Sequence, residues 1–156
     1  MATIQGRSRR TKSGEMLEPG IKSECFLLAD SAEACNGKLY VLGAGWDSLN
    51  AREFPTIHPR ITLPIVLSVP WGETNQDHTF LISLRDDDNQ PVLPEPFTGS
   101  FKLGRPVDAV PGEPMKIVVA VNVNNLKIER EGRYTFVLEV DGRELGRTSF
   151  RARRTQ

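Results

Sequence analysis

The stretch "GRYTFVLEVDGRELGRTSF", residues 132–150, decides the fold class of this chain. Its first half places an apolar residue at every second position: Tyr134, Phe136, Leu138 and Val140. A period of two puts these side chains on one face of a β-strand. The next pair, Asp141-Gly142, suits a two-residue hairpin turn because both residues accept positive φ angles. The stretch therefore predicts an antiparallel hairpin with one face in a core.

Similar patterns recur along the rest of the chain. Short strands are expected at residues 24–30, 38–49, 60–69, 78–84, 99–106, 115–128, 132–140 and 143–150, with a further short one at 91–93. Asn36-Gly37 is a second hairpin signal, and Pro64 indicates an edge strand or a bulge. No stretch predicts a helix. The sequence therefore predicts an all-β fold, an antiparallel β-sandwich of eight or nine short strands, immunoglobulin-like or C2-like.

A dinucleotide site is a competing interpretation of residues 37–55, "GKLYVLGAGWDSLNAREFP". There an apolar run leads into Gly43-Ala44-Gly45, as in a Gly-x-Gly phosphate loop. Such a loop must open onto a helix that holds the pyrophosphate. Here Pro55 and Pro59 follow too soon for a helix, and Ser48 stands where the third glycine belongs. Glycines within a strand pattern more often mark a bulge or a close backbone approach.

Length and charge suggest one domain with basic ends. The chain has 156 residues, enough for a single core. We expect a flexible basic arm at residues 1–21, a β-sandwich domain at 22–152 and a basic tail at 153–156. The arginines of the two ends are Arg7, Arg9, Arg10, Arg151, Arg153 and Arg154. Residues 22–150 carry 13 basic and 18 acidic side chains, a net of −5. The ends are therefore either solvated or in contact with an acidic surface, such as that of a neighbouring copy.

The start of the chain and its cysteines point to the cytoplasm. The N-terminal basic residues precede no apolar stretch, so a secretory signal is not expected, and no run is long enough to span a membrane. Residues 1–15 are either a genuine arm or an over-extended start, since Met16 could open the domain. Cys25 is expected to be a buried thiol, and two cysteines make no disulfide framework.

Two tryptophans stand where strands meet polar loops. Trp46 lies in "GAGWDS" and Trp71 in "VPWGETNQD". Large aromatic residues at such junctions either plug a core or anchor a protein interface. If they form an interface, its polar rim is Asp47, Glu73, Asn75 and Asp77.

The turn at Asp86, Asp87 and Asp88 raises the question of calcium. Calcium prefers clustered carboxylate oxygens, but an EF-hand's glycine and distal glutamate are missing. A C2-like site would need Asp30 or Asp47 as a second acidic loop. Turn chemistry alone also explains these residues, so no metal and no cofactor are expected.

Catalytic signals are absent from the sequence. The chain has two histidines, His58 and His78, and neither belongs to a recognised catalytic motif. An enzyme would need a pocket that brings His78 together with an acidic side chain and a hydroxyl. Nucleic acid is not an expected partner, because the body is acidic and no aromatic residue interleaves the short basic stretches.

Three stretches resemble a known family. They are "CFLLADSAEACNGKLYVLGAGWDSL", "LPIVLSVPWGETNQDHTFLISLRDDDNQPV" and "EGRYTFVLEVDGRELGRTSF". They are similar to an uncharacterised family of small bacterial β-sandwich proteins, common in actinobacteria, over about residues 23–152. The resemblance implies a bacterial cytosolic protein and carries no activity or catalytic residues with it.

We therefore expect a non-catalytic protein that acts through protein–protein contacts, as an adaptor or interaction module. One alternative is a self-assembling or shell-decorating structural protein that uses basic arms on acidic neighbours. A calcium-binding C2-like module is a further alternative, and an enzyme is the least favoured.

Overall fold

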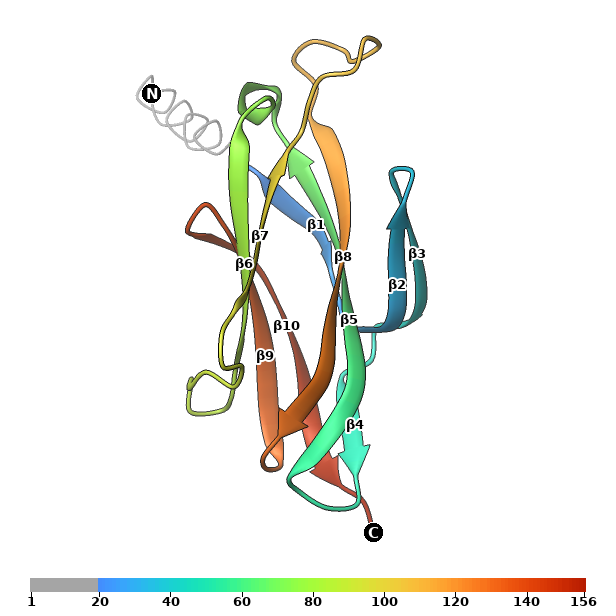
Figure 1. Cartoon of the computed structure of the whole chain (residues 1–156), viewed down its shortest axis with the longest axis vertical. Coiled ribbons are helices and arrows are strands. Elements are labelled where there is room, and N and C mark those ends of the chain that lie inside the picture. The colour runs from blue at the N-terminus through green and yellow to red at the C-terminus, as the bar shows by residue number, and fades with distance from the viewer. Residues whose placement is uncertain (1–19) are drawn as a thin grey trace, which may run out of the picture.

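The fold consists of ten β-strands and one short 3-10 helix. The computed structural model describes residues 20–156 (Figure 1). The strands are β1 (Lys22–Phe26), β2 (Ala29–Cys35), β3 (Lys38–Ala44), β4 (Ser48–Ala51), β5 (Thr56–Val69), β6 (Asp77–Arg85), β7 (Phe97–Lys102), β8 (Met115–Ile128), β9 (Gly132–Val140) and β10 (Arg143–Arg154), with the helix η1 (Trp71–Glu73) after β5. The all-β prediction is confirmed. The expected eight or nine short strands are ten, and three of these have 12 or 14 residues.

The first sheet is organised around β5. On one side, β8 pairs with β5 from Thr56 to Val69. On the other side, β1 pairs with residues 65–68 of β5, and β2 pairs with it at Thr62. β3 continues from β2 as a hairpin that stands apart from the body of the molecule (Figure 1). β5 thus carries three other strands.

The second sheet has the order β4-β10-β9-β6-β7. Most of its pairs are antiparallel, as predicted. The exception is β4, which runs parallel to the end of β10, with Ser48 opposite Arg151 and Ala51 opposite Arg154. This pair joins residues about a hundred positions apart, so no local turn signal could reveal its direction.

One hydrophobic core lies between the two sheets, which curl into two half-barrels. The inward face of β5 supplies Ile61, Leu63, Ile65, Leu67 and Val69. Opposite it lie Ile82 and Leu84 of β6 and, from β9, Tyr134, Phe136, Leu138 and Val140. The alternation in residues 132–140 thus predicted the buried face correctly.

Both predicted hairpin turns are confirmed. Asn36 and Gly37 have φ angles of 49° and 75°, and Asp141 and Gly142 have φ angles of 50° and 79°. The surroundings of Gly43 explain its glycine without a dinucleotide site. A Cβ there would lie 2.3 Å from the carboxylate of Asp30, so the glycine allows a close approach within a β-hairpin.

Two predictions are wrong, one for the strand at residues 24–30 and one for the strand that contains Pro64. The strand expected at 24–30 is broken after Phe26, and β2 begins only at Ala29. β5 is a central strand rather than an edge. Pro64 lies in the gap between the β1 and β2 pairings, where its missing N–H is not needed on that side. The bulge is in β1, between Ser23 and Cys25.

The domain boundaries differ from the predicted ones by a few residues. Residues 1–19 of the predicted arm lie outside the described residues. Ile21 was assigned to the arm, but it is buried in the core. Arg153 and Arg154 were assigned to the tail, but they belong to β10. Within residues 20–156, no helix has the length and apolar character that a membrane crossing requires.

The core packing predicts the effect of Phe136→Ala. Phe136 is fully buried between the sheets, so its truncation should lower the free energy of unfolding by about 3–5 kcal/mol. Urea unfolding measures this, with Tyr40→Ala on the exposed β3 as the control. Similar losses for both variants would contradict the assigned core.

Candidate functional site

The two sheets leave one side of the molecule open between β7 and β8. Among the strands of residues 20–156, β7 pairs only with β6, and β8 pairs only with β5. Each therefore has one backbone edge with no strand beside it in that part of the chain. Residues of both strands line the same cavities, such as Phe101 and Val119. The free edges thus flank one depression, named here the seam groove.

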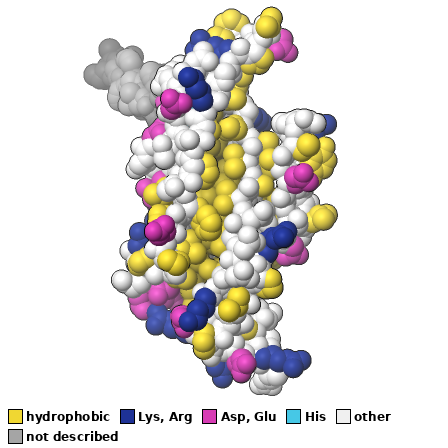
Figure 2. Space-filling view, viewed as in Figure 1, with side chains coloured by type: hydrophobic (Ala, Val, Ile, Leu, Met, Phe, Trp, Pro, Cys, Tyr) yellow, Lys and Arg dark blue, Asp and Glu magenta, His cyan; other side chains and the backbone are white. Residues whose placement is uncertain are grey.

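Half-buried apolar side chains line the seam groove. They are Phe97, Phe101, Leu103, Ile117, Val119 and Val121. Figure 2 shows hydrophobic side chains gathered along the long axis of this face, between β6 and β7 on one side and β8 on the other. An apolar surface that is continuous and open to solvent usually marks an interaction site.

The groove deepens at one end into a cavity of about 900 Å³. Residues 91–97 form one wall, and residues 123–127 of β8 form the other. Glu129 and Arg130 add a charged rim, while Asn124 and Asn125 supply amides. Ligand sites have volumes of about 300–1,000 Å³, with mostly apolar walls and a few polar groups, so this end has suitable dimensions for a bound segment.

Close packing explains the glycine of β7 beside the groove. A Cβ on Gly99 would lie 2.5 Å from the ring of Phe80. The ring of Phe80 therefore packs directly on the backbone of β7. This contact holds β7 against β6 and keeps the groove wall in place.

The predicted tryptophan interface does not form as one surface. Trp46 packs near His58 at the start of β5, with ring centroids 6.3 Å apart. Trp71 follows Val69 at the other end of β5. The 11 residues that separate His58 from Val69 span about 36 Å of strand. The two tryptophans, with Asp47 beside Trp46, therefore lie near opposite ends of β5.

Each tryptophan is half-buried as part of its own loop. Trp46 packs on the core near Phe150, and its indole Nε1 has no hydrogen-bond partner within the described residues. Arg105 covers one face of Trp71, with its guanidinium carbon 4.1 Å from the ring centroid. Arg105 also donates hydrogen bonds to the Trp71 carbonyl at 2.8 Å and to Thr74 Oγ1 at 2.6 Å. These contacts fit a structural role for both rings.

The predicted rim residues Glu73, Asn75 and Asp77 do lie together, in the loop between β5 and β6. Asn75 has a φ angle of 60°, and its N–H donates to the Leu103 carbonyl at 2.8 Å. Asp77 is exposed at the start of β6. The Glu73 carbonyl faces inward, where it accepts a hydrogen bond from His78.

His78 is a buried histidine with two acceptors around it. Its Nδ1 donates to Asp141 Oδ2 at 2.7 Å, and its Nε2 donates to the Glu73 carbonyl at 2.7 Å. Both partners are acceptors, so both ring nitrogens must carry protons. Burial alone lowers the pKa of His78, but the hydrogen bonds to Asp141 and Glu73 outweigh it and raise the pKa. The hydrogen bond from His78 lowers the pKa of Asp141.

This geometry gives the enzyme alternative little support. The expected acidic neighbour of His78 is present, but neither ring nitrogen is free to accept a proton from a substrate. The ring also stacks on Phe101 at 5.2 Å. His78 instead ties the loop before β6 to the turn between β9 and β10.

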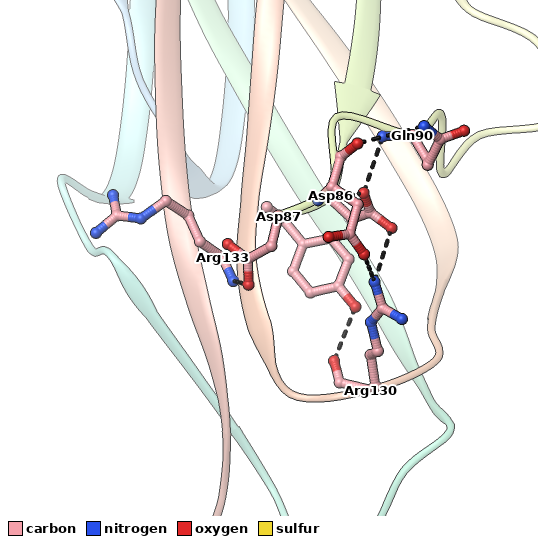
Figure 3. Close-up of polar contacts among 7 residues, drawn as sticks. Asp86, Asp87, Gln90, Arg130 and Arg133 are labelled. Atoms are coloured by element: carbon pink, nitrogen blue, oxygen red, sulfur yellow. Dashed lines mark hydrogen bonds and ion pairs between the residues drawn. The ribbon is translucent and has the colours of Figure 1, made fainter.

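Arg130 pairs with two of the three carboxylates of the acidic turn (Figure 3). It contacts Asp88 Oδ2 at 2.7 Å and Asp86 Oδ2 at 3.2 Å. Asp86 Oδ1 accepts hydrogen bonds from the backbone N–H groups of Asp88 and Gln90, each at 2.9 Å. Asp87 Oδ2 accepts the N–H of Arg133 at 3.0 Å.

All three carboxylates thus serve the turn itself, which weakens the calcium alternative. Residues 20–156 contain no group of three or more acidic, histidine or cysteine side chains suited to a metal ion.

The remaining predicted residues have varied outcomes. Arg7, Arg9 and Arg10 lie outside the described residues. Arg151 and Arg153 are exposed on β10 rather than in a loose tail. Cys25 is half-buried rather than fully buried, and Cys35 is exposed.

Sequence reasoning missed the seam groove. The alternation at Ile117, Val119 and Val121 predicts a strand with one buried face. It could not reveal that one edge of β8 lacks a partner, because period-two patterns report faces and not edges.

The chain belongs to the family of unknown function DUF6941, which it matches over residues 24–153. No curated protein matches it. The expected resemblance to a family without an assigned activity is therefore confirmed.

Two solved structures are distant matches to this chain. The alkylpurine DNA glycosylase AlkC of Pseudomonas fluorescens, bound to DNA containing an abasic site analogue, shares 13% identity at a TM-score of 0.49 over 89% of this chain. A β-glucosidase of Listeria innocua shares 13% identity at a TM-score of 0.43 over 84% of this chain. The chain spans only 32% and 16% of those two proteins. Likenesses this weak carry no argument about activity.

The His78–Asp141 pair predicts a pH dependence of stability. The folded pKa of His78 is raised, so its contribution is complete below about pH 6.5 and is lost as the pH rises through the folded value. The pKa of Asp141 is lowered, so its contribution is present above about pH 4 and is lost as the pH falls. The His78–Asp141 pair should therefore stabilise the folded state most between about pH 4 and pH 6.5.

Thermal unfolding of wild type and Asp141→Asn tests this dependence. Asparagine accepts the positive φ angle and can still accept the hydrogen bond, but it carries no charge. We expect the wild-type melting temperature to fall from pH 6 to pH 9 by more than that of the variant. If the melting temperatures of the two proteins changed equally with pH, a doubly protonated His78 paired with Asp141 would be excluded.

Proposed function

We propose that this protein is a non-catalytic interaction module that binds an extended segment of a partner protein in the seam groove. The observation that carries the proposal is the apolar groove between the unpaired edges of β7 and β8. In β-strand addition, a peptide backbone pairs with a free strand edge while alternate side chains enter pockets. The groove offers both features along one line.

The lining defines the chemistry of the partner segment. Apolar side chains at every second position would pack against Phe97 and Phe101 on one wall and against Val119 and Val121 on the other. The wide end, with Asn124 and Arg130 at its rim, would accept a larger or polar residue. The preferred segment is therefore extended, with alternating β-branched or aromatic residues.

We also propose that the two sheets form an immunoglobulin-like β-sandwich. Tyr134, near the start of β9, supports it. Its phenol hydroxyl donates to the Arg130 carbonyl at 2.8 Å, four residues upstream and before the strand begins. A tyrosine that bonds back in this way is a hallmark of immunoglobulin-like sandwiches. We further propose a cytoplasmic location, because the free thiols of Cys25 and Cys35 fit a reducing compartment.

Self-assembly is a second candidate function, favoured by β3. This edge strand stands out from the body and exposes Tyr40 and Leu42, which are 58% and 72% accessible. Exposed apolar edge strands readily pair with another chain. An antiparallel pair of β3 strands centred on Val41 would set Tyr40 of one copy against Leu42 of the other.

Native mass spectrometry separates the two candidates. The interaction module predicts a species near 17.4 kDa for the purified chain. Multiples of that mass that disappear in Leu42→Lys would favour self-assembly through β3 instead.

A displayed library of random peptides tests the seam groove. Selection against the full chain should enrich peptides with alternating apolar residues, and Val121→Lys should abolish their binding. Val121→Thr keeps the branched shape and should weaken binding in part, which guards against a misfolded lysine variant. Ile57→Lys, on an exposed site of β5, is the matched control and should bind normally. Enriched peptides that bind Val121→Lys and wild type equally would overturn the proposal.

A further inference from the structure

The outer face of the second sheet gathers arginines that are scattered in the sequence. Its strand registers place Arg151 between Ser48 of β4 and Arg133 of β9. The next row holds Ser149, Thr135 and Arg85. The residues that alternate with these rows along β9 and β10 are buried in the core; they are Tyr134, Phe136, Phe150 and Ala152. Successive side chains of a strand point to opposite faces, so the side chains of the two rows point away from the core. Arg147 and Arg153 of β10 extend the same face, named here the arginine face.

The pair Arg133 and Arg151 is unusual for a β-sheet. The two residues are directly opposite on antiparallel strands, where side chains of like charge repel. Within residues 20–156, neither guanidinium takes part in a salt bridge or a side-chain hydrogen bond. By contrast, Arg130 and Arg147 both have carboxylate partners. Figure 3 shows the Arg133 side chain extending away from the acidic turn.

The surroundings of this pair are rich in hydrogen-bond donors. Thr135 and Ser149 share a hydrogen bond of 2.8 Å in the adjacent row. Arg85, Arg133 and Arg147 line one hollow of about 220 Å³, which Asp86 and Asp87 also line.

The acidic groups nearby are already engaged. Asp87 accepts the backbone N–H of Arg133, and Glu144 holds Arg147 through two hydrogen bonds of 2.7 and 2.9 Å. Within residues 20–156, the guanidinium N–H groups of Arg133 and Arg151 thus remain open to an external anion.

From this arrangement we infer that the arginine face binds an acidic segment of a protein partner. Guanidinium groups form paired hydrogen bonds with carboxylates. Arg151 and Arg153 are two residues apart on one strand, about 7 Å, which equals the spacing of alternate carboxylates on an extended acidic segment. Such a segment would pair its carboxylates with Arg151 and Arg153 and relieve the repulsion at Arg133.

Nucleic acid fits the same face less well. Single-stranded nucleic acid is bound by stacking on aromatic side chains, and the rows described contain none. The inference is independent of the seam groove, which lies between β7 and β8 and not on the outer face of β4, β9 and β10.

Fluorescence anisotropy with a labelled peptide of 20 glutamates tests the inference. Wild type should bind, with an affinity that falls as salt rises. The double variant Arg133→Thr/Arg151→Thr should bind at least tenfold more weakly. The control Arg60→Thr/Lys38→Thr removes the same charge from the first sheet and should change the affinity less than twofold. Equal losses in the two double variants, or no binding by wild type, would overturn the inference.

Two further readouts sharpen the test. The melting temperature of free Arg133→Thr/Arg151→Thr should equal or exceed that of wild type, because the variant removes a repulsion. A clear fall would assign the arginines to the fold and overturn the inference. A labelled single-stranded DNA of 20 nucleotides serves as the competing probe. Tighter binding of the DNA than of the glutamate peptide, lost in the same variant, would overturn the choice of partner.

Discussion

The burial of one face of β5 is the constraint on which the rest of the structure depends. Five apolar side chains of this strand enter the core, and three other strands pair with its edges. β8 occupies one entire edge of β5, and among the strands of residues 20–156 none pairs with the other edge of β8. The second sheet ends in β7, a strand of six residues. The open seam therefore lies between β8, which pairs only with β5, and β7, which is the last strand of the second sheet.

Polar contacts hold the ends of this arrangement in place. His78 joins the loop before β6 to the turn after β9, and Arg105 fixes the Trp71 loop. At the other end, Arg130 draws the acidic turn towards the turn before β9. Both ring nitrogens of His78 are engaged in these contacts. The groups that do remain open are the apolar walls of the seam groove and the guanidinium groups of the arginine face. The proposed partner segments would bind at these two places.

Local pattern predicted the local structure well. The turns at Asn36-Gly37 and Asp141-Gly142 and the buried face of residues 134–140 follow from short-range chemistry, so the sequence was sufficient for them. Long-range placement could not be predicted. Nothing near Ser48 signals its parallel pairing with Arg151, and nothing near Trp46 signals its distance from Trp71. The same limit hid the seam groove, because the partner of each strand edge depends on contacts between distant residues. The register of Arg133 with Arg151 was hidden for a local reason, because the bulge between Glu144 and Gly146 shifts the pairing of β10 by one residue.

Hydrogen–deuterium exchange of the full chain tests the open seam most directly. In β5, both sets of alternate amides face a partner strand over residues 65–68, so they should exchange slowly. In β7 and β8, the amides that point away from β6 and β5 should exchange rapidly, while the alternate amides are protected. This alternation is the result that the account predicts. Uniform protection along β7 and β8 would mean that the seam is closed, and it would contradict a groove available to a partner.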